Sequence, residues 1–380
     1  MAANHLVLVT GGTGFVATFT IFQLLQRGYS VRTTVRNLDR SKELNKDLVA
    51  LNKYDHVKGK EDTGKTFQLV TPELLESNLV YYSADLSKDS GWDEAINGVD
   101  FILHIASPIG EHDSTEDEMV KPAVEGTLRI LNLSLKYHVK RVVVMSSCAA
   151  VKYDGRKPDP VTGVPPLANE KCFSTPKDVP NAYSKSKLMQ EFAVWDWVKS
   201  EKNVNSSHPV EVSVINPPAI YGPNIPGKVS LTAQAIIKSL VDGKMKFGVP
   251  RIYFSGVDVR DVAYITYRSM IEPFAKNQRY IVDSNDEEDY PFINLATAIR
   301  KHYAIPANNI NNKVKISNLP TRVLPSWLLR TLALFVPLLK LVVPLLDKRT
   351  HTTNAKAVKA FNWTPISYVE SVFASIDSLP

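Results

Sequence analysis

The chain has 380 residues, of which 44% are hydrophobic and 22% charged, and these proportions are ordinary for a globular protein that buries a core of normal size. The formal net charge of +6 is spread along the sequence, so we expect no nucleic-acid partner and a mild preference for anionic ligands such as nucleotide phosphates. Two cysteines, Cys148 and Cys172, are too few for a disulfide framework or a metal cluster. We therefore expect a reducing, cytoplasmic location and no bound metal.

Short apolar and β-branched runs alternate with helical stretches through the first half of the chain, and this order predicts parallel strands joined by crossover helices. The first strand, at 6–10, begins so close to Met1 that we expect no targeting peptide. A helix is expected at 15–27, ending before Gly28, and a long crossover helix at 118–137. Further strands are expected at 31–36, 79–85, 101–106, 142–147 and 211–217.

This rhythm predicts an α/β fold in two parts. Residues 1–217 are expected to form a Rossmann domain with a doubly wound parallel sheet. Residues 218–380 are expected to form a smaller, mostly helical region that binds the substrate and is interleaved with the last sheet strands. Two stretches interrupt the pattern: 52–66 is a polar, lysine-rich surface insertion, and 153–180, with six prolines, is a long irregular connection that could shape a neighbouring site.

The segment 325–346 reads PSWLLRTLALFVPLLKLVVPLL and is long and apolar enough to suggest a membrane span. Two charges inside it, Arg330 and Lys340, and two interrupting prolines argue against a span. We expect helices that pack on the protein and help to wall an apolar substrate pocket; contact with a membrane surface is the alternative. The face expected to pack consists of Trp327, Leu328, Leu332 and Phe335.

The sequence TGGTGFVA at 10–17 lies directly between the first strand and the first helix. Gly11, Gly12 and Gly14 let the chain turn tightly and let backbone N–H groups approach a pyrophosphate at the helix N-terminus. Ala17 supplies a small residue where the helix packs on the strand. A glycine cluster alone could be a structural turn, but the strand before it and the helix after it favour a dinucleotide site.

The end of the second strand bears on the choice between NAD and NADP. An NAD site places a carboxylate there for the ribose 2′-hydroxyl, whereas this chain has Arg36 and no acid before Asp39. Arg36 is therefore expected to pair with the 2′-phosphate of NADP(H). Asp85, after the third strand, either contacts the adenine edge or caps a local turn. Lesser candidates for the phosphate are Arg32, Arg40 and Lys42.

The pattern Tyr-x-x-x-Lys occurs three times, but only Tyr183 and Lys187 lie on a credible helix. Their i, i+4 spacing places both on one face, so that the lysine could favour the phenolate and let Tyr183 exchange a proton with a carbonyl oxygen. Ser146 and Ser147 end the preceding strand, and either hydroxyl could bind the same oxygen or be structural. Cys148 is expected to be a small packed residue rather than a nucleophile.

With these motifs the chain resembles the extended short-chain dehydrogenase/reductase family, also described as the NAD-dependent epimerase/dehydratase family. Within it, the resemblance is to dihydroflavonol 4-reductase-like enzymes and microbial aldehyde or ketone reductases. The matching pieces span nearly the whole chain in the family's order: TGGTGFVA at 10–17, GYSVRTTVR at 28–36, ADL at 84–86, HIASP at 104–108, VVVMSS at 142–147, YSKSK at 183–187, NPPAIYGP at 216–223 and VDVRDVA at 257–263.

The resemblance implies a catalytic set of Ser147, Tyr183 and Lys187, with Ser147 preferred because it is the second serine of its pair. It also implies nucleotide contacts that the motifs alone do not give, from Ala106 and, on the nicotinamide side, from Pro217. The residues expected to bind NADP(H) are Gly11, Gly12, Thr13, Gly14, Phe15, Val16, Arg36, Asp85, Leu86, Ala106, Tyr183, Lys187 and Pro217.

Two positions depart from the family. Glu125 stands where the family often has an asparagine, and Lys152 stands where plant flavonoid reductases carry one, which argues against a dihydroflavonol substrate. The function that we expect is NADPH-dependent reduction of a hydrophobic aldehyde or ketone. The alternatives are a membrane-associated NAD(P)-dependent hydroxysteroid or sterol dehydrogenase and a non-catalytic NADP-sensing regulator. The oligomeric state is left open by the sequence.

Overall fold

The structure is a computed structural model that describes residues 5–54, 67–108, 115–157, 159–161, 165–229, 233–284, 290–336, 339, 342–350 and 352–380. Most of the polar insertion predicted at 52–66 therefore lies outside the described residues. At the centre is a sheet of seven strands in the order β10-β6-β5-β4-β1-β2-β3, and every neighbouring pair is parallel. The strands are β1 (Leu6–Val9), β2 (Ser30–Val35), β3 (Leu79–Ser83), β4 (Phe101–His104), β5 (Arg141–Met145), β6 (Glu211–Asn216) and β10 (Gln278–Ile281).

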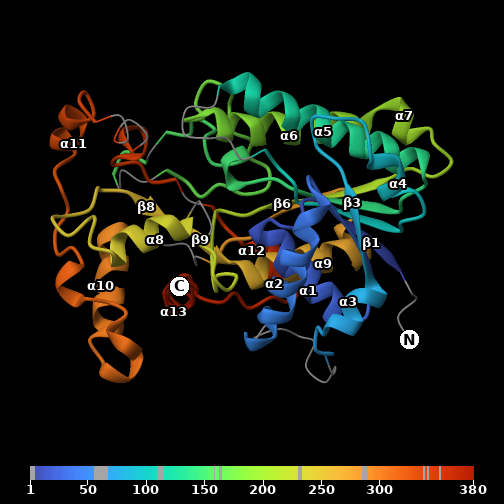
Figure 1. Cartoon of the computed structure of the whole chain (residues 1–380). Coiled ribbons are helices and arrows are strands. Elements are labelled where there is room, and N and C mark those ends of the chain that lie inside the picture. Colours follow the sequence, from blue (N-terminus) through green and yellow to red (C-terminus); the bar gives the residue numbers. More distant parts are fainter. Residues whose placement is uncertain are drawn as a thin grey trace.

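Helices cover both faces of this sheet, which is why its central strands are apolar throughout (Figure 1). Side chains alternate between the faces: Val7 and Val9 of β1 join the core under one set of helices, and Leu8 joins the core under the other. The first set is α1 (Phe15–Gln26), α2 (Ser41–Ala50), α3 (Pro72–Asn78), α9 (Val259–Ile271) and α12 (Ala355–Phe361). The second set is α4 (Trp92–Ile96), α5 (Glu116–Lys136) and α6 (Ala182–Lys199), followed by the short α7 (Glu201–Val204). The predicted doubly wound Rossmann fold is confirmed.

The C-terminal region forms a third core beside the carboxyl edge of the sheet. It is mostly helical, as predicted, and also contains two small paired-strand units; its buried residues include Tyr221, Leu240, Phe292 and Val372. The chain returns from this region to the main sheet through α9, β10 and α12, so the two parts are interleaved. The boundary at residue 217 stays a prediction. The elements are β7 (Ala219–Tyr221), α8 (Ala233–Val241), β8 (Tyr253–Phe254), β9 (Gly256–Asp258), β11 (Tyr290–Pro291), α10 (Phe292–Tyr303), α11 (Ser326–Leu332) and α13 (Tyr368–Asp377).

The segment 325–346 differs from the prediction. Among the residues of this segment that the structure describes, only the seven of α11 form an α-helix, and its buried side is taken by Leu329 and Ala333, one helical turn apart. The face expected to pack is turned outward, with Trp327 68%, Leu332 40% and Phe335 79% exposed. Leu328 is half-buried, so the predicted packed face is wrong for three of its four residues, and the pocket wall stays a prediction. Among the described residues, none of the helices has the length and apolar character needed to cross a bilayer.

Candidate active site

The loop between β1 and α1 has the shape that a pyrophosphate requires. Gly11 has a φ of +72°, and a Cβ atom there would lie 3.1 Å from the Cβ atom of Ala106; a Cβ atom at Gly12 would collide with Thr33. Gly14 is the N-cap of α1 and brings no side-chain cap, which leaves the first-turn N–H groups to face a ligand. The predicted residues Gly11 and Ala106 thus meet at the carboxyl ends of β1 and β4, and a dinucleotide fits this cradle.

The cations near the end of β2 have different neighbours. Arg32 donates to the carbonyl oxygens of Glu94, Ala95 and Asn97 at 2.7–3.2 Å and so serves the end of α4. Arg40 pairs with Glu43 at 3.2 Å. Arg36 is exposed directly after the strand. These contacts leave Arg36 as the leading phosphate candidate; its role stays a prediction.

Asp85 caps a local turn, with its Oδ1 atom accepting from the backbone N of Ser87 at 2.8 Å and from its hydroxyl at 2.6 Å. These hydrogen bonds lower the pKa of Asp85, and the charge of Arg36 contributes in the same direction. Of the two sequence interpretations, the turn cap is present in the structure, and the adenine contact remains a prediction. The next residue, Leu86, packs on α5, where a Cβ atom at Gly126 would lie 3.0 Å from its Cβ atom.

The structure separates the two serines that follow β5. The Ser146 hydroxyl, 2% exposed, donates to Glu191 Oε2 at 2.6 Å and is fully engaged in the core. The Ser147 hydroxyl accepts from the backbone N of Ala149 at 3.1 Å and lies near enough to the Tyr183 hydroxyl to lower the pKa of that phenol. Ser147 also lies beside Pro217, whose carbonyl oxygen is 3.4 Å from Ser147 Oγ. The fold therefore brings Ser147, Tyr183 and Pro217 together.

Tyr183 begins α6, whose N-cap Asn181 accepts from the backbone N of Ser184 at 2.8 Å. Tyr183 is 44% exposed overall, yet burial around its hydroxyl raises the pKa, while the hydrogen bond from Ser147 and the charge of Lys152 oppose the rise. A tyrosine is protonated at neutral pH, so Tyr183 has a proton to donate, and the opposing effects of Ser147 and Lys152 favour its release.

Lys187 donates hydrogen bonds to two partners in the core. Its Nζ atom donates to the carbonyl oxygen of Met145 at 2.8 Å and to Gln190 Oε1 at 3.3 Å. Burial lowers the pKa of Lys187 to about 8, and the charge of Glu191 opposes this shift. The ammonium group of Lys187 is thus turned towards the core, and the expected effect of Lys187 on the Tyr183 pKa stays a prediction.

Lys152 is a cation whose charge lowers the pKa of Tyr183, a contribution that sequence reasoning missed. It follows the 3₁₀ turn Cys148–Ala150, and its backbone N donates to the Cys148 carbonyl oxygen at 3.0 Å. Although burial opposes its charge, Tyr153, Cys148 and Asp283 together raise the pKa of Lys152, so it stays a cation. The one sequence feature that could have indicated this contribution is the lysine at a position where plant flavonoid reductases carry an asparagine. Cys148 is buried, and burial raises the pKa of its thiol, as expected of a packed residue.

A buried chain of hydrogen bonds joins the glycine loop to Lys187. Thr10 Oγ1 accepts from the backbone N atoms of Ile105 and Ala106 and contacts His104 Nδ1 at 3.0 Å. His104 Nε2 contacts Thr127 Oγ1 at 2.9 Å, and Gln190 Nε2 donates to the same oxygen at 2.8 Å.

Gln190 completes this chain by accepting from Lys187. Burial, with the charge of Lys187 as a lesser cause, lowers the pKa of His104 to about 3, so the imidazole is neutral. Thr10 already accepts two N–H groups, so its hydroxyl donates to Nδ1, and Nε2–H then donates to Thr127. This connection could not be predicted from sequence, because its members come from four elements that are distant in the chain, namely β1, β4, α5 and α6.

A second buried network supports the serine strand. Glu191, with a fully buried side chain, is paired with Arg279 of β10 at 2.7 Å. Asn216 Nδ2 donates to Glu191 at 2.7 Å and to the carbonyl oxygen of Ser147 at 3.1 Å. Since Glu191 also accepts from Ser146, this ion pair ties the ends of β5, β6 and β10 behind Ser147.

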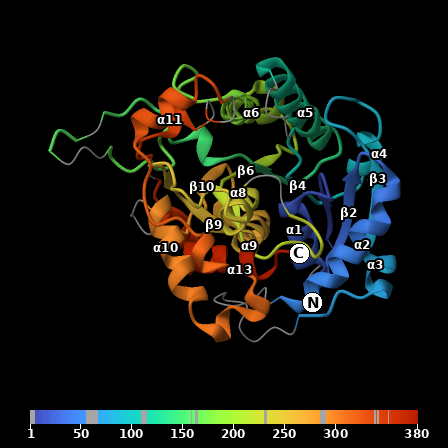
Figure 2. The same cartoon turned by 60° about the vertical axis from the view of Figure 1, so that its left-hand side comes forward.

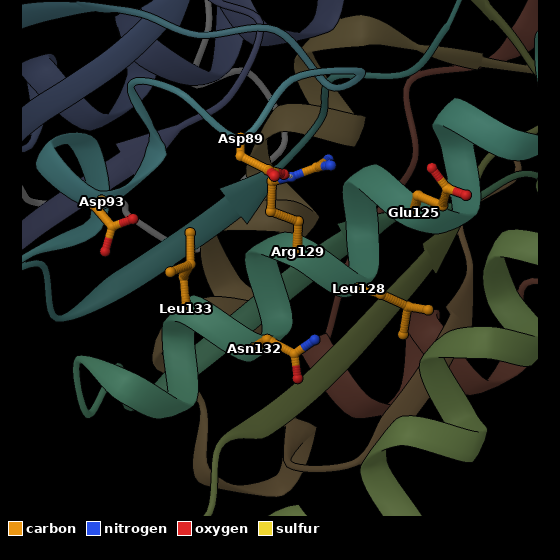
Figure 3. Close-up of a pocket in the computed structure, with 7 residues that line it drawn as sticks. All are labelled: Asp89, Asp93, Glu125, Leu128, Arg129, Asn132 and Leu133. Carbon is orange, nitrogen blue, oxygen red and sulfur yellow. Dashed lines mark hydrogen bonds and ion pairs between the residues drawn. The ribbon is translucent and has the colours of Figure 1, made fainter.

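Glu125 is on the exposed side of α5, whereas Thr127 of the buried hydrogen-bond chain is on the buried side. It borders a shallow pocket whose lining is Asp89, Asp93, Glu125, Leu128, Arg129, Asn132 and Leu133 (Figure 3). Inside the pocket Arg129 is paired with Asp89. None of the predicted site residues lines it, so this pocket is separate from the candidate active site.

Comparison with known proteins agrees with the family that the sequence motifs suggested. Residues 7–266 match the NAD dependent epimerase/dehydratase family. Cinnamoyl-CoA reductase 1 of Petunia hybrida is 31% identical over 311 residues, covering 80% of each chain. The ketoreductase azaE of Aspergillus niger is 31% identical over 291 residues, covering 72% of this chain and 76% of its own.

Among solved structures, the yeast methylglyoxal/isovaleraldehyde reductase Gre2 complexed with NADPH is similar to this chain with a TM-score of 0.71. Its identity is 20%, and the match covers 98% of this chain and 97% of that one, which supports the fold. The prediction of an NAD(P)-dependent enzyme is confirmed at the level of the family. The chain belongs to the NAD dependent epimerase/dehydratase family, as its motifs predicted.

Proposed function

We propose that this chain is an NADP(H)-dependent oxidoreductase that reduces an aldehyde or a ketone to the alcohol. The observation that carries the proposal is the placement of Ser147, directly after β5, and Tyr183, at the start of α6, so close together that the serine hydroxyl lowers the pKa of the phenol. A tyrosine is protonated at neutral pH and can therefore donate a proton. Relatives named cinnamoyl-CoA reductase and ketoreductase, and a neighbour of the same fold bound to NADPH, support this reaction.

The residues at the glycine loop fit the cofactor. The space that a side chain would fill at Gly11 and Gly12, and the uncapped N-terminus of α1, suit a pyrophosphate. Exposed Arg36 suits a 2′-phosphate, which favours NADPH over NADH. When bound, NADPH supplies the hydride that adds to the carbonyl carbon.

The side chains supply the proton. Ser147 positions the carbonyl oxygen beside the Tyr183 hydroxyl, and Tyr183 donates its proton to that oxygen as negative charge develops there. Lys152 and Ser147 stabilise the phenolate that remains, since both lower the pKa of Tyr183. A solvent proton then restores the phenol, so one carbonyl, one NADPH and one proton give one alcohol and one NADP⁺.

The test is NADPH consumption with a panel of aldehydes and ketones, using Tyr183→Phe. This variant should lose at least a hundredfold in kcat and keep its affinity for NADPH, because the hydroxyl acts on the proton and not on the nucleotide. Tyr54→Phe is the matched control: the Tyr54 hydroxyl donates to the Asn224 carbonyl oxygen, away from the site, so activity should persist. A Tyr183→Phe enzyme that kept most of its turnover would refute the assignment.

A further inference from the structure

Five large apolar side chains stand exposed together on α11 and in the turn that follows it. We call this set the α11 patch; it consists of Trp327, Leu332, Leu334, Phe335 and Val336, with exposed fractions of 68%, 40%, 74%, 79% and 42%. Elsewhere in the described chain, no ten-residue stretch exposes more than two large apolar side chains. Single exposed apolar residues are ordinary, whereas a contiguous group of this kind indicates a binding surface.

The patch is exposed because Leu329 is the one residue of α11 that is buried against the protein. Leu329 joins Ile252 and Leu346 in a small core, and this contact fixes which side of the helix faces inward. Trp327 and Phe335 consequently point away from the protein. Both views of the molecule place α11 at its periphery (Figures 1 and 2), so an extended surface could reach it.

The charge around the patch is basic. The segment 321–350 contains five lysines and arginines and one acidic residue, Asp347, and thus holds a net charge of +4 out of the +6 of the whole chain. Arg330 and Arg251 lie 3.2 and 3.9 Å from Asp347 with side chains 54% and 62% exposed. Lys348 is exposed next to Asp347. This combination of Trp, Phe and Leu with flanking cations is characteristic of segments that lie in the interface of an anionic membrane.

We propose that the α11 patch docks this protein on the surface of an anionic lipid bilayer. Trp327 and Phe335 enter the interfacial layer, while Arg330, Arg251 and Lys348 meet the phospholipid headgroups. The protein lies on the bilayer rather than across it, in keeping with the seven-residue length of α11.

The patch is also close to the candidate active site along the chain. Asp347, which pairs with Arg330 of α11, is five positions before Thr352, a reach of at most about 18 Å. The Thr352 hydroxyl lies 3.8 Å from the thiol of Cys148, which follows Ser147. Docking therefore brings the carboxyl edge of the sheet near the bilayer, where apolar carbonyl compounds accumulate. Docking itself does not depend on the proposed reductase activity, but the delivery of such a substrate does.

The test is co-sedimentation of the full chain with vesicles of phosphatidylcholine, with and without phosphatidylserine. The unmodified protein should bind the anionic vesicles more strongly, and salt should weaken this binding. The double variant Trp327→Ser, Phe335→Ser should lose at least tenfold in partitioning. Ile310→Ser, at a position 73% exposed outside the patch, should leave it unchanged. Lys348→Gln should lose about fivefold on anionic vesicles alone.

Three results would overturn the proposal. The first is failure of the unmodified protein to sediment with either vesicle, and the second is equal binding to both. The third is a dimer in lipid-free buffer that the double variant converts to a monomer, since the patch would then be covered by a second copy of the chain. The melting temperature of each variant shows whether a loss of binding comes from unfolding. Substitutions at these exposed positions should change Tm little.

Discussion

Lys187→Met offers a test of how the fold treats a buried charge in its candidate active site. Lys187 is 3% exposed, and burial lowers its pKa from 10.5 to about 8. A shift of this size corresponds to about 3 kcal/mol, which the folded state loses by keeping the lysine charged. The loss is present in full below pH 8 and disappears as the pH rises to 10.5, because over that window the unfolded chain binds the proton and the folded chain does not.

The variant also removes two hydrogen bonds, to Met145 and Gln190, each with a contribution of roughly 1–3 kcal/mol. At pH 7 the cost of the buried charge and the stabilisation from its hydrogen bonds nearly cancel. The quantity to measure is therefore the change in unfolding free energy with pH. The free energy of unfolding of the unmodified protein, relative to Lys187→Met, should rise by about 3 kcal/mol between pH 8 and pH 10.5.

Urea unfolding followed by circular dichroism at a series of pH values measures this difference, and titrations common to both proteins cancel. Lys185→Met is the matched control on the same helix, where the lysine is partly exposed and paired with Glu116; its difference from the unmodified protein should be nearly independent of pH over this window. A constant difference for Lys187→Met across the window would refute the reasoning, since the buried ammonium would then titrate as it does in water.

Two predictions concern the charged groups around the cofactor and the phenol. Arg36→Ala should raise the KM for NADPH at least tenfold and leave that for NADH nearly unchanged, because only NADPH carries the 2′-phosphate; steady-state kinetics with both cofactors measures this, and equal effects would contradict it. Lys152→Gln should move the alkaline limb of the pH profile for alcohol oxidation upward, since Lys152 lowers the pKa of Tyr183 and oxidation needs the phenolate. A limb that did not move would show that Lys152 does not act on Tyr183.

The sheet could be predicted from sequence because each strand is a local apolar run bounded by polar or glycine residues. The strand expected at 31–36 is found at Ser30–Val35, and the helix expected to contain Tyr183 begins at Ala182. The buried side of α11 could not be predicted, since Trp327, Leu328, Leu329 and Leu332 point in several directions around the helix. The choice of Leu329 as the buried residue depends on Ile252, far away in the sequence.

Within the candidate site, the residues that belong to sequence motifs could be predicted. The residues that meet only in the folded structure could not. Lys187 was identified by its spacing from Tyr183, but the direction of its ammonium group is decided by the Met145 carbonyl oxygen and by Gln190. Local periodicity places two residues on one face of a helix and says nothing of which backbone oxygen a long side chain will reach. His104 belongs to the HIASP motif, and nothing in its neighbours along the chain indicates that the buried hydrogen-bond chain depends on it.

His104 gives the complementary prediction at acid pH. Its pKa is lowered from 6.5 to about 3, so the folded protein excludes a proton that the unfolded chain binds. Stability should therefore fall by about 1.4 kcal/mol for each pH unit below 6.5 because of this residue. His104→Gln, which does not titrate and still offers one acceptor and one donor to Thr10 and Thr127, should flatten the decline.

Exposed His208 supplies the control for His104, and His208→Gln should leave the slope unchanged. Urea unfolding between pH 6.5 and 4.5 measures all three proteins. If His104→Gln declined as steeply as the unmodified chain, the imidazole would be free to charge within the core. The neutral link between the glycine loop and Lys187 would then be lost near pH 6, where the hydrogen bond from Thr10 to Nδ1 requires an unprotonated ring. A flattened slope means instead that the fold keeps this link intact over the whole range in which a carbonyl reductase would work.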